Sequence, residues 1–323
     1  MTVTVTEGML GHMSENRWTA DRIPDQTGRT VIVTGANSGL GLATTRQLAK
    51  RGAHVIMAVR NETKGRQALA SLADTQPGAS LELRHLDLAD LDSVRAFAER
   101  LHADGARVDV LVNNAGVMMP PRSLSPQGQE SQFASNHLGH FALTGLLLDL
   151  LEAGTDPRVV TVSSSLHRRG TIHFDDLTGA RKYSPSAYYA QSKFANVLFG
   201  LELHRRLSAK GSPVRSLLAH PGYAATNLQT TGPTGLAKTL GGIGNRLLAQ
   251  DAEMGALPQL YAATAASAQS GQFIGPGGMA EMRGYPKVVR PVPSAEDPAT
   301  AARLWTLSQE LTGVSYLERV PGR

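Results

Sequence analysis

The sequence of 323 residues contains no cysteine, which excludes disulfide bonds and thiolate metal ligands. Aromatic residues make up only 5% of the chain, and they do not interleave with its scattered basic pairs as a base-stacking surface would require. The net charge of +5 is mild, and acidic residues lie between the basic ones. We therefore expect no nucleic-acid partner.

Long hydrophobic runs are also missing. No stretch reaches the roughly 18 consecutive apolar residues of a membrane-spanning helix. The N-terminus lacks the basic-then-apolar pattern of a signal peptide, and His, Asp and Glu do not cluster at the spacing of a metal site. We expect a cytoplasmic protein with no bound metal and no membrane partner.

Short runs rich in β-branched residues alternate with helix-period segments. The strand-like runs are 31–33, 55–57, 81–83, 110–112, 159–162 and 216–218. The helical patterns between them cover 40–51, 62–73, 91–103, 129–152 and 186–209. This alternation predicts an α/β fold of the Rossmann type, a doubly wound parallel sheet with helices on both faces.

The same pattern gives the expected domain organisation. The pattern predicts an irregular N-terminal arm over residues 1–27 and one Rossmann-fold domain over residues 28–323. The C-terminal part of this domain carries additional substrate-binding loops. Within that part, residues 223–250 are rich in Gly and Thr and interrupt the alternation of strand and helix patterns. This predicts a mobile substrate lid. Residues 296–311 start with acids and Pro298 and predict a surface helix.

A glycine-rich loop joins the first predicted strand to the first helix. Its sequence over residues 34–41 is TGANSGLG, with the spacing G-x-x-x-G-x-G. Glycines allow a tight turn and a close approach of a pyrophosphate, which a helix N-terminus favours electrostatically. The loop predicts a dinucleotide site formed by Gly35, Asn37, Ser38, Gly39, Leu40 and Gly41.

The end of the second predicted strand indicates which dinucleotide binds. An acidic residue there would favour NAD by holding the ribose 2′-hydroxyl. The chain has Arg60 instead, and a guanidinium pairs well with a 2′-phosphate. NADP(H) is therefore the expected cofactor.

Tyr189 and Lys193 lie four residues apart on a predicted helix and so share a face. A phenol with its ordinary pKa of about 10 is a poor acid–base catalyst. A neighbouring ammonium and a positively charged nicotinamide both favour the phenolate, so we expect Lys193 and the cofactor to lower the pKa of Tyr189. The adjacent Tyr188 has Ser192 one helical turn later, which offers no positive charge.

Together with further motifs, these residues resemble the short-chain dehydrogenase/reductase family over about residues 28–228. The segment 133–141 around Asn136 and the long insertion before Tyr189 resemble its retinol dehydrogenase-like branch in particular. The motifs that carry the likeness are the glycine loop, Asp87, Asn113-Asn114-Ala115-Gly116, Asn136, Ser163-Ser164-Ser165, Tyr189 with Lys193, and Pro221-Gly222.

The resemblance implies a role for each matching residue. Tyr189 exchanges a proton with the substrate oxygen, which Ser164 also hydrogen-bonds. Lys193 holds the nicotinamide ribose, and Asn136 anchors a water that links Lys193 to solvent. The implied cofactor contacts are Asp87 and Leu88 at the adenine, Asn114, Ala115 and Gly116 in the cofactor bed, and Pro221, Gly222 and Thr226 over the nicotinamide. The family also implies a homodimer or homotetramer.

The leading expectation is an NADP(H)-dependent oxidoreductase that interconverts a carbonyl and an alcohol on an apolar small molecule. One alternative is an NADPH-dependent C=C reductase, and another is a non-catalytic NADP-binding sensor or scaffold. A serine hydrolase is disfavoured because no G-x-S-x-G elbow surrounds Ser164. We interpret His137 and His140, in an apolar helix, as packing residues.

Overall fold

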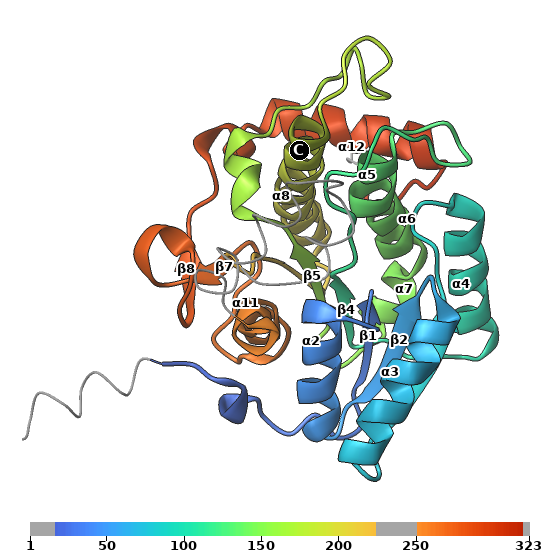
Figure 1. Cartoon of the computed structure of the whole chain (residues 1–323), viewed down its shortest axis with the longest axis vertical. Coiled ribbons are helices and arrows are strands. Elements are labelled where there is room, and N and C mark those ends of the chain that lie inside the picture. The colour runs from blue at the N-terminus through green and yellow to red at the C-terminus, as the bar shows by residue number, and fades with distance from the viewer. Residues whose placement is uncertain (1–16, 224–250, 319–323) are drawn as a thin grey trace, which may run out of the picture.

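The computed structural model describes residues 17–223 and 251–318 (Figure 1). Its strands form one eight-stranded sheet in the order β3-β2-β1-β4-β5-β6-β7-β8. All neighbouring strands are parallel except β8, which runs antiparallel to β7. The strands are β1 (Thr30–Thr34), β2 (His54–Val59), β3 (Leu81–His85), β4 (Val110–Asn113), β5 (Arg158–Val162), β6 (Arg215–Ala219), β7 (Phe273–Pro276) and β8 (Pro286–Val289). The predicted doubly wound sheet is confirmed.

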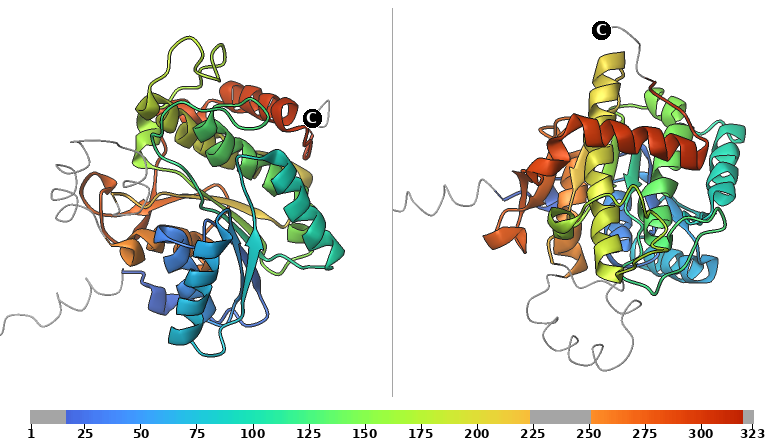
Figure 2. Two further views of the ribbon diagram at one scale, coloured as in Figure 1. Left: turned by 45° about the vertical axis from the view of Figure 1, so that its right-hand side comes forward. Right: turned by 90° about the horizontal axis from the view of Figure 1, so that it is seen from above.

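Helices cover both faces of this sheet (Figures 1 and 2). One face carries α2 (Gly39–Lys50), α3 (Glu62–Thr75) and α11 (Ala252–Thr264). The other carries α4 (Leu91–Ala103), α6 (Gly139–Leu146), α7 (Leu148–Glu152) and α8 (Pro185–Lys210), and α12 (Pro298–Thr312) packs against α8. The predicted surface helix over 296–311 corresponds to α12.

The central strands are apolar along their length because both sides are covered. In β1, Val31 and Val33 belong to the core beneath α2 and α11, and Ile32 between them belongs to the core beneath α4 and α6. All three are fully buried. The alternation of side chains across a strand thus divides one apolar run between two cores.

The long helix α8 has clear signals at both ends. The hydroxyl of Ser184 accepts a hydrogen bond from the backbone N–H of Ala187, and Pro185 occupies the first helical position. Gly211 ends the helix in a left-handed conformation with φ of 66°. The predicted helix over 186–209 therefore differs by one residue at each end.

Of the predicted N-terminal arm, the described part begins at residue 17. It contains a short 3-10 helix, η1 (Ala20–Arg22), and it buries Ile23 in the core. The rings of Trp18 and Tyr261 meet edge to face with their centroids 5.3 Å apart. This contact packs the first described residues against α11.

The C-terminal part contains elements that the sequence pattern did not predict, namely α11, β7 and β8. The proposed lid over 223–250 lies outside the described residues, except for Tyr223.

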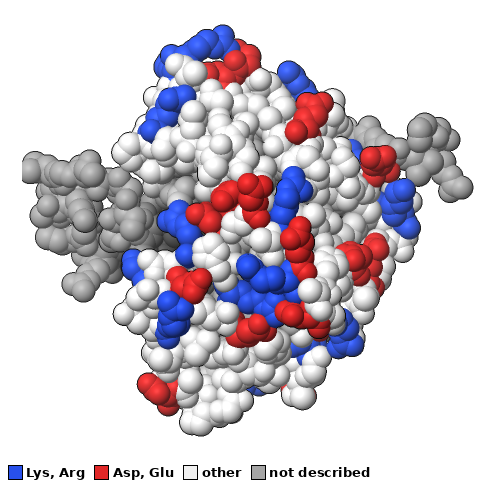
Figure 3. Space-filling view, turned by 90° about the vertical axis from the view of Figure 1, so that its right-hand side faces the viewer, with Lys and Arg blue, Asp and Glu red and all other residues white. Residues whose placement is uncertain are grey.

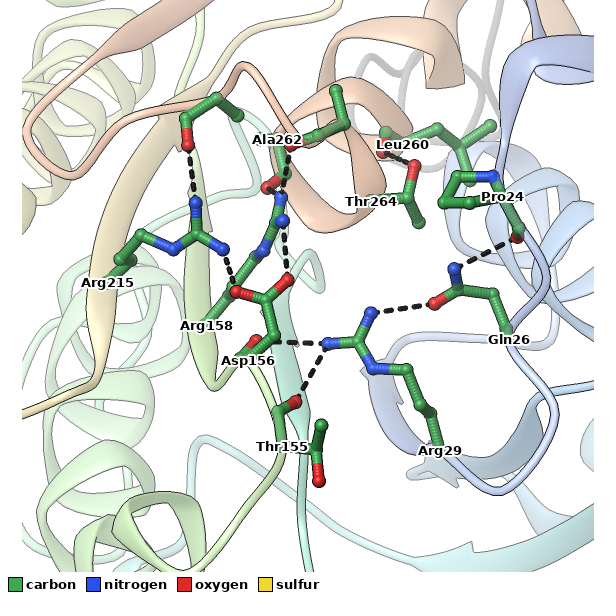
Figure 4. A network of polar contacts seen from close by, with 12 residues as sticks. Pro24, Gln26, Arg29, Thr155, Asp156, Arg158, Arg215, Leu260, Ala262 and Thr264 are labelled. Carbon is green, nitrogen blue, oxygen red and sulfur yellow. Dashed lines mark hydrogen bonds and ion pairs between the residues drawn. The ribbon is translucent and has the colours of Figure 1, made fainter.

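A polar network fastens α11 to the amino edge of the sheet (Figure 4). The buried guanidinium of Arg158, at the start of β5, donates to two backbone carbonyls at the C-terminal end of α11, those of Ala262 and Ala265, at 3.0 and 2.9 Å. Asp156 pairs with Arg158 at 2.7 Å and also with Arg215. Cations near a helix C-terminus are stabilising.

The surface seen in Figure 3, which faces right in Figure 1, carries Lys and Arg among Asp and Glu. Arg84 pairs with both Glu82 and Asp104, at 2.6 and 2.8 Å. In the part of the chain that the structure describes, no helix is both long and apolar enough to cross a bilayer.

Candidate active site

The glycine loop between β1 and α2 forms a cradle whose backbone lies too close for side chains at Gly35 and Gly41. Gly35 and Gly39 have positive φ of 68° and 54°. A Cβ on Gly41 would lie 2.4 Å from the carbonyl oxygen of Gly35, and one on Gly35 would lie 3.1 Å from Ala115. Ser38 precedes α2 without a side-chain cap, so the first N–H groups of that helix suit an anion. The cradle fits a dinucleotide pyrophosphate.

Thr34, the last residue of β1, orders the backbone next to this cradle. Its hydroxyl oxygen accepts hydrogen bonds from the backbone N–H groups of Asn114 and Ala115, both at 2.9 Å. The side-chain amide of Asn114 donates to the Thr34 carbonyl at 2.7 Å and accepts from Gln259 of α11 at 3.3 Å. The predicted residues Asn114 and Ala115 thus adjoin the glycine loop. Thr34 and Gln259 were not predicted.

The residues predicted for the adenosine end lie at the same edge of the sheet. Arg60 follows β2 and is exposed, and Asp87 follows β3 and is half-buried. The Asp87 carboxylate accepts from the backbone N–H of Ala89 at 3.0 Å. Leu88 is buried, and a Cβ on Gly139 would lie 2.2 Å from its carbonyl oxygen. Its side chain belongs to the core beneath α4 and α6 and so has a packing role as well.

Tyr189 and Lys193 lie on the buried side of α8, where they are only 6% and 3% exposed. The Lys193 ammonium is 5.8 Å from the centroid of the Tyr189 ring and donates to the carbonyl of Val162 at 3.2 Å. The hydroxyl of Ser163 donates to the Lys193 carbonyl at 2.8 Å. Ser164, two residues after β5, lies close enough to Tyr189 for its hydroxyl to lower the pKa of that phenol. Within the serine run, Ser164 is therefore the residue beside the tyrosine.

For the protein without cofactor, the expectation that the pKa of Tyr189 is lowered is wrong. Burial raises the pKa of Tyr189 to about 12, and the Ser164 hydroxyl opposes this only in part. Burial also lowers the pKa of Lys193 to about 8. Desolvation disfavours the charged form of each group, and it is the largest cause of both shifts. Tyr189 is a protonated phenol at neutral pH, which suits a proton donor.

Asn136 is fully buried in a π-helical turn, η2 (Ala134–Leu138), between α5 (Ser131–Phe133) and α6. Its side-chain oxygen accepts from the backbone N–H of Val117 at 2.8 Å, and its nitrogen donates to the hydroxyl of Ser192 at 2.9 Å. A Cβ on Gly116 would lie 3.1 Å from the Asn136 side-chain oxygen and 3.5 Å from the Lys193 ammonium. These three predicted residues therefore meet at one point.

The turn after β6 contains Pro221 and Gly222. Gly222 has φ of 67°, and a Cβ there would lie 2.4 Å from the carbonyl oxygen of Met282. The backbone N–H of Tyr223 donates to the same carbonyl at 2.8 Å. Thr226, predicted to close over the nicotinamide with this turn, lies outside the described residues.

The sequence did not predict Glu281, whose carboxylate connects this turn to the segment that follows Ser164. Glu281 contacts the ring of His220 at 3.0 Å and accepts from Arg168 at 2.9 Å. His220 directly precedes the turn, and Arg168 lies in η3 (Ser165–Arg169), which follows Ser164. The hydrogen bond from His220, followed by that from Arg168, lowers the pKa of Glu281 to about 2. Glu281 is distant in sequence from both partners, so no motif spacing points to it.

The comparisons with known proteins agree with this geometry. The family model for short chain dehydrogenases matches residues 29–235. Human retinol dehydrogenase 13 is 43% identical over 294 residues, which cover 89% of this chain and 85% of the relative. The crystal structure of an uncharacterised protein from Mycobacterium paratuberculosis has 46% identity and a TM-score of 0.76, over 92% of this chain and 98% of that one.

A more distant structure, a short chain dehydrogenase from Escherichia coli in complex with NADPH, has 25% identity and a TM-score of 0.59. It covers 77% of this chain and 97% of its own. The fold, the glycine cradle and these matches lead to one conclusion: the chain belongs to the short-chain dehydrogenase/reductase family and resembles its retinol dehydrogenases.

Proposed function

We propose that the protein is an NADP(H)-dependent oxidoreductase that interconverts a carbonyl and an alcohol on an apolar small molecule. The observation that carries the proposal is the meeting of Tyr189, Lys193 and Ser164 at the carboxyl edge of the sheet, the edge at which the glycine cradle also opens. Ligands of open α/β sheets bind at this edge, where the strand order reverses. Here the reversal lies between β1 and β4.

When bound, NADP(H) supplies or accepts the hydride. The residues that would hold it are the cradle glycines, Asn114 and Lys193. Tyr189 donates its phenolic proton to the oxygen of the substrate carbonyl during reduction and takes it back during oxidation. Ser164 donates a second hydrogen bond to that oxygen, which stabilises the charge that develops on it.

The preference for NADP(H) rests on Arg60. It is exposed, it follows β2 directly, and the next residue, Asn61, caps α3 by accepting from the backbone N–H of Lys64 at 2.9 Å. A 2′-phosphate at this point would meet a guanidinium beside a helix N-terminus. The NADPH complex of the Escherichia coli relative supports the same cofactor. An apolar substrate is supported by the retinol named for the human relative.

We expect Arg60→Ala to weaken NADPH binding by about 1.5–3 kcal/mol, the range for hydrogen bonds to charged groups. NADH binding should hardly change. The measurement is a fluorescence titration of each cofactor. Arg66→Ala is the matched control, because Arg66 is an exposed cation on α3 that pairs with Glu62 at 2.9 Å. Equal losses for both cofactors, or a wild-type preference for NADH, would contradict the assignment.

The proposed reaction is tested by incubating the wild-type protein with NADPH and a panel of apolar aldehydes and ketones. We expect loss of NADPH absorbance that depends on the carbonyl compound, with the alcohol as product. Consumption only with activated alkenes would instead indicate a C=C reductase. NADPH binding without turnover of either class would indicate a sensor or scaffold.

A further inference from the structure

His140 hydrogen-bonds through both nitrogens of its ring, although the sequence suggested only packing. It is 1% exposed and lies in the first turn of α6, one turn after Asn136. Its Nδ1 is 3.0 Å from the backbone carbonyl oxygen of Asn136. Its Nε2 is 2.9 Å from the hydroxyl oxygen of Thr34. The ring therefore bridges the cofactor cradle and the turn that carries Asn136.

The two partners fix the position of the ring proton. A carbonyl oxygen only accepts, so Nδ1 carries the hydrogen and donates to Asn136. The Thr34 oxygen already accepts from the N–H groups of Asn114 and Ala115. Its own proton points at the nearer of two acceptors, Nε2 at 2.9 Å rather than the carbonyl oxygen of Val112 at 3.3 Å. Burial lowers the pKa of His140 to about 4, and the charge of Lys193 adds to this in a lesser way. The ring is neutral at physiological pH.

Each end of this bridge leads to a different part of the site. At the Thr34 end, the hydroxyl orders the backbone of Asn114 and Ala115, which line the glycine cradle. At the Asn136 end, the side chain of that residue binds Val117 and the hydroxyl of Ser192, the residue before Lys193 in α8. His140 thus connects the cofactor cradle to the helix that carries Tyr189 and Lys193.

We propose that His140 is a positioning residue. By hydrogen-bonding both the carbonyl of Asn136 and the hydroxyl of Thr34, it holds these two groups in place relative to each other, and so couples cofactor binding to proton transfer. This inference rests on the proposed function. His140 itself touches neither the substrate nor the cofactor. Its two hydrogen bonds act on different steps, since Thr34 orders the cradle and Asn136 orders the catalytic helix.

Three variants separate the two bonds. His140→Leu removes both. His140→Asn keeps a donor near the Nδ1 position for the Asn136 carbonyl, and His140→Gln keeps a polar group near Nε2 for Thr34. The matched control is His137→Leu, because His137 is equally buried but its Nε2 lies 2.9 Å from the hydroxyl of Ser308 on α12. All four are compared with wild type by NADPH titration, single-turnover rate and thermal unfolding.

We expect His140→Leu to lose about tenfold or more in both NADPH affinity and single-turnover rate, because it removes both hydrogen bonds of the bridge at once. His140→Asn should recover most of the rate but not the affinity, and His140→Gln most of the affinity but not the rate. His137→Leu should lose stability while keeping both within about twofold, as an apolar replacement remote from the cradle and the catalytic pair.

The proposal is overturned if the His140 variants match His137→Leu in affinity and rate, or if Asn and Gln fail to separate the two losses. If His140→Leu does not fold, the Asn and Gln variants still decide between these results. Wild-type protein that binds NADPH but reduces no carbonyl compound would contradict the proposed function. The NADPH affinities of the Gln and Asn variants would still test whether the hydrogen bond from His140 to Thr34 supports cofactor binding.

The tautomer gives an independent check. In ¹⁵N-histidine-labelled protein, with the His140 signal assigned by its loss in His140→Asn, we expect the proton on Nδ1 and no titration between about pH 5 and 8. A proton on Nε2, or a charged ring at about pH 6, would contradict the bridge.

Discussion

Replacing Tyr189 by phenylalanine is expected to lower the single-turnover rate by about 10²–10⁴-fold, the usual contribution of a general acid. The substitution removes the phenolic proton and leaves the ring and its packing in place. The cofactor residues on β1 and β4 are unaffected, so NADPH affinity should stay close to that of the wild type. The measurement is a single-turnover rate beside an NADPH titration of the same preparation.

Tyr188→Phe is the matched control for this variant. Tyr188 is buried beside Tyr189 in the same helix, but its hydroxyl donates to the backbone carbonyl of Asp176. Its ring lies 4.9 Å from that of Tyr183, centroid to centroid. We expect it to keep most of the activity and to lose about 1 kcal/mol of stability, the value of one hydrogen bond. A Tyr189→Phe protein as active as Tyr188→Phe would mean that another group is the acid.

Lys193→Met is expected to have opposite effects on function and stability. Turnover should fall by about 100-fold or more, and NADPH binding by about tenfold, because one ammonium serves both. The free energy of unfolding at pH 7 should rise by up to about 3 kcal/mol, since the buried ammonium, whose pKa is lowered from 10.5 to about 8, no longer has to be desolvated. Chemical denaturation without cofactor measures this. A variant less stable than the wild type would contradict the burial cost.

The pH dependence of wild-type reduction follows from the same group. Tyr189 remains protonated over the accessible range, and Lys193 loses its charge as the pH rises through about 8. The reduction rate should therefore fall above about pH 8. Because the folded pKa lies below the unfolded one, the stability penalty is present below about pH 8 and disappears as the pH rises toward 10.5. The stability advantage of Lys193→Met should shrink over that interval. A reduction rate that rises through pH 8 would be inconsistent with this assignment.

The sequence pattern predicted the sheet because each central strand is a continuous apolar run between two helix layers. All six predicted strands are present as β1 to β6. It did not predict β7 and β8, which are short, and β8 is half-exposed at the edge of the sheet, so its residues carry no burial pattern. The single helix expected over 129–152 is divided into α5, the π-helical turn around Asn136, α6 and α7. The π-helical turn has no distinct periodicity in the sequence.

For the site, residues within one motif were predictable and residues that join motifs were not. Tyr189 and Lys193 were found because the helix places both on one face. Thr34 and His140 are joined by a hydrogen bond across 106 positions of the chain. Nothing in local spacing reveals such a contact. For the protein without cofactor, the pKa of Tyr189 was predicted to shift in the wrong direction, because burial of the phenol is a property of the fold.

The most direct test of the central claim is transfer of deuterium from NADPH that carries deuterium at both hydrogen positions of nicotinamide C4. Wild-type protein is incubated with the labelled cofactor and an apolar aldehyde or ketone, and the product is analysed by mass spectrometry. We predict an alcohol with one deuterium on the former carbonyl carbon, formed at a rate that Tyr189→Phe abolishes almost completely. An unlabelled alcohol, a label on the carbon of a former double bond, or no consumption of NADPH would contradict the account.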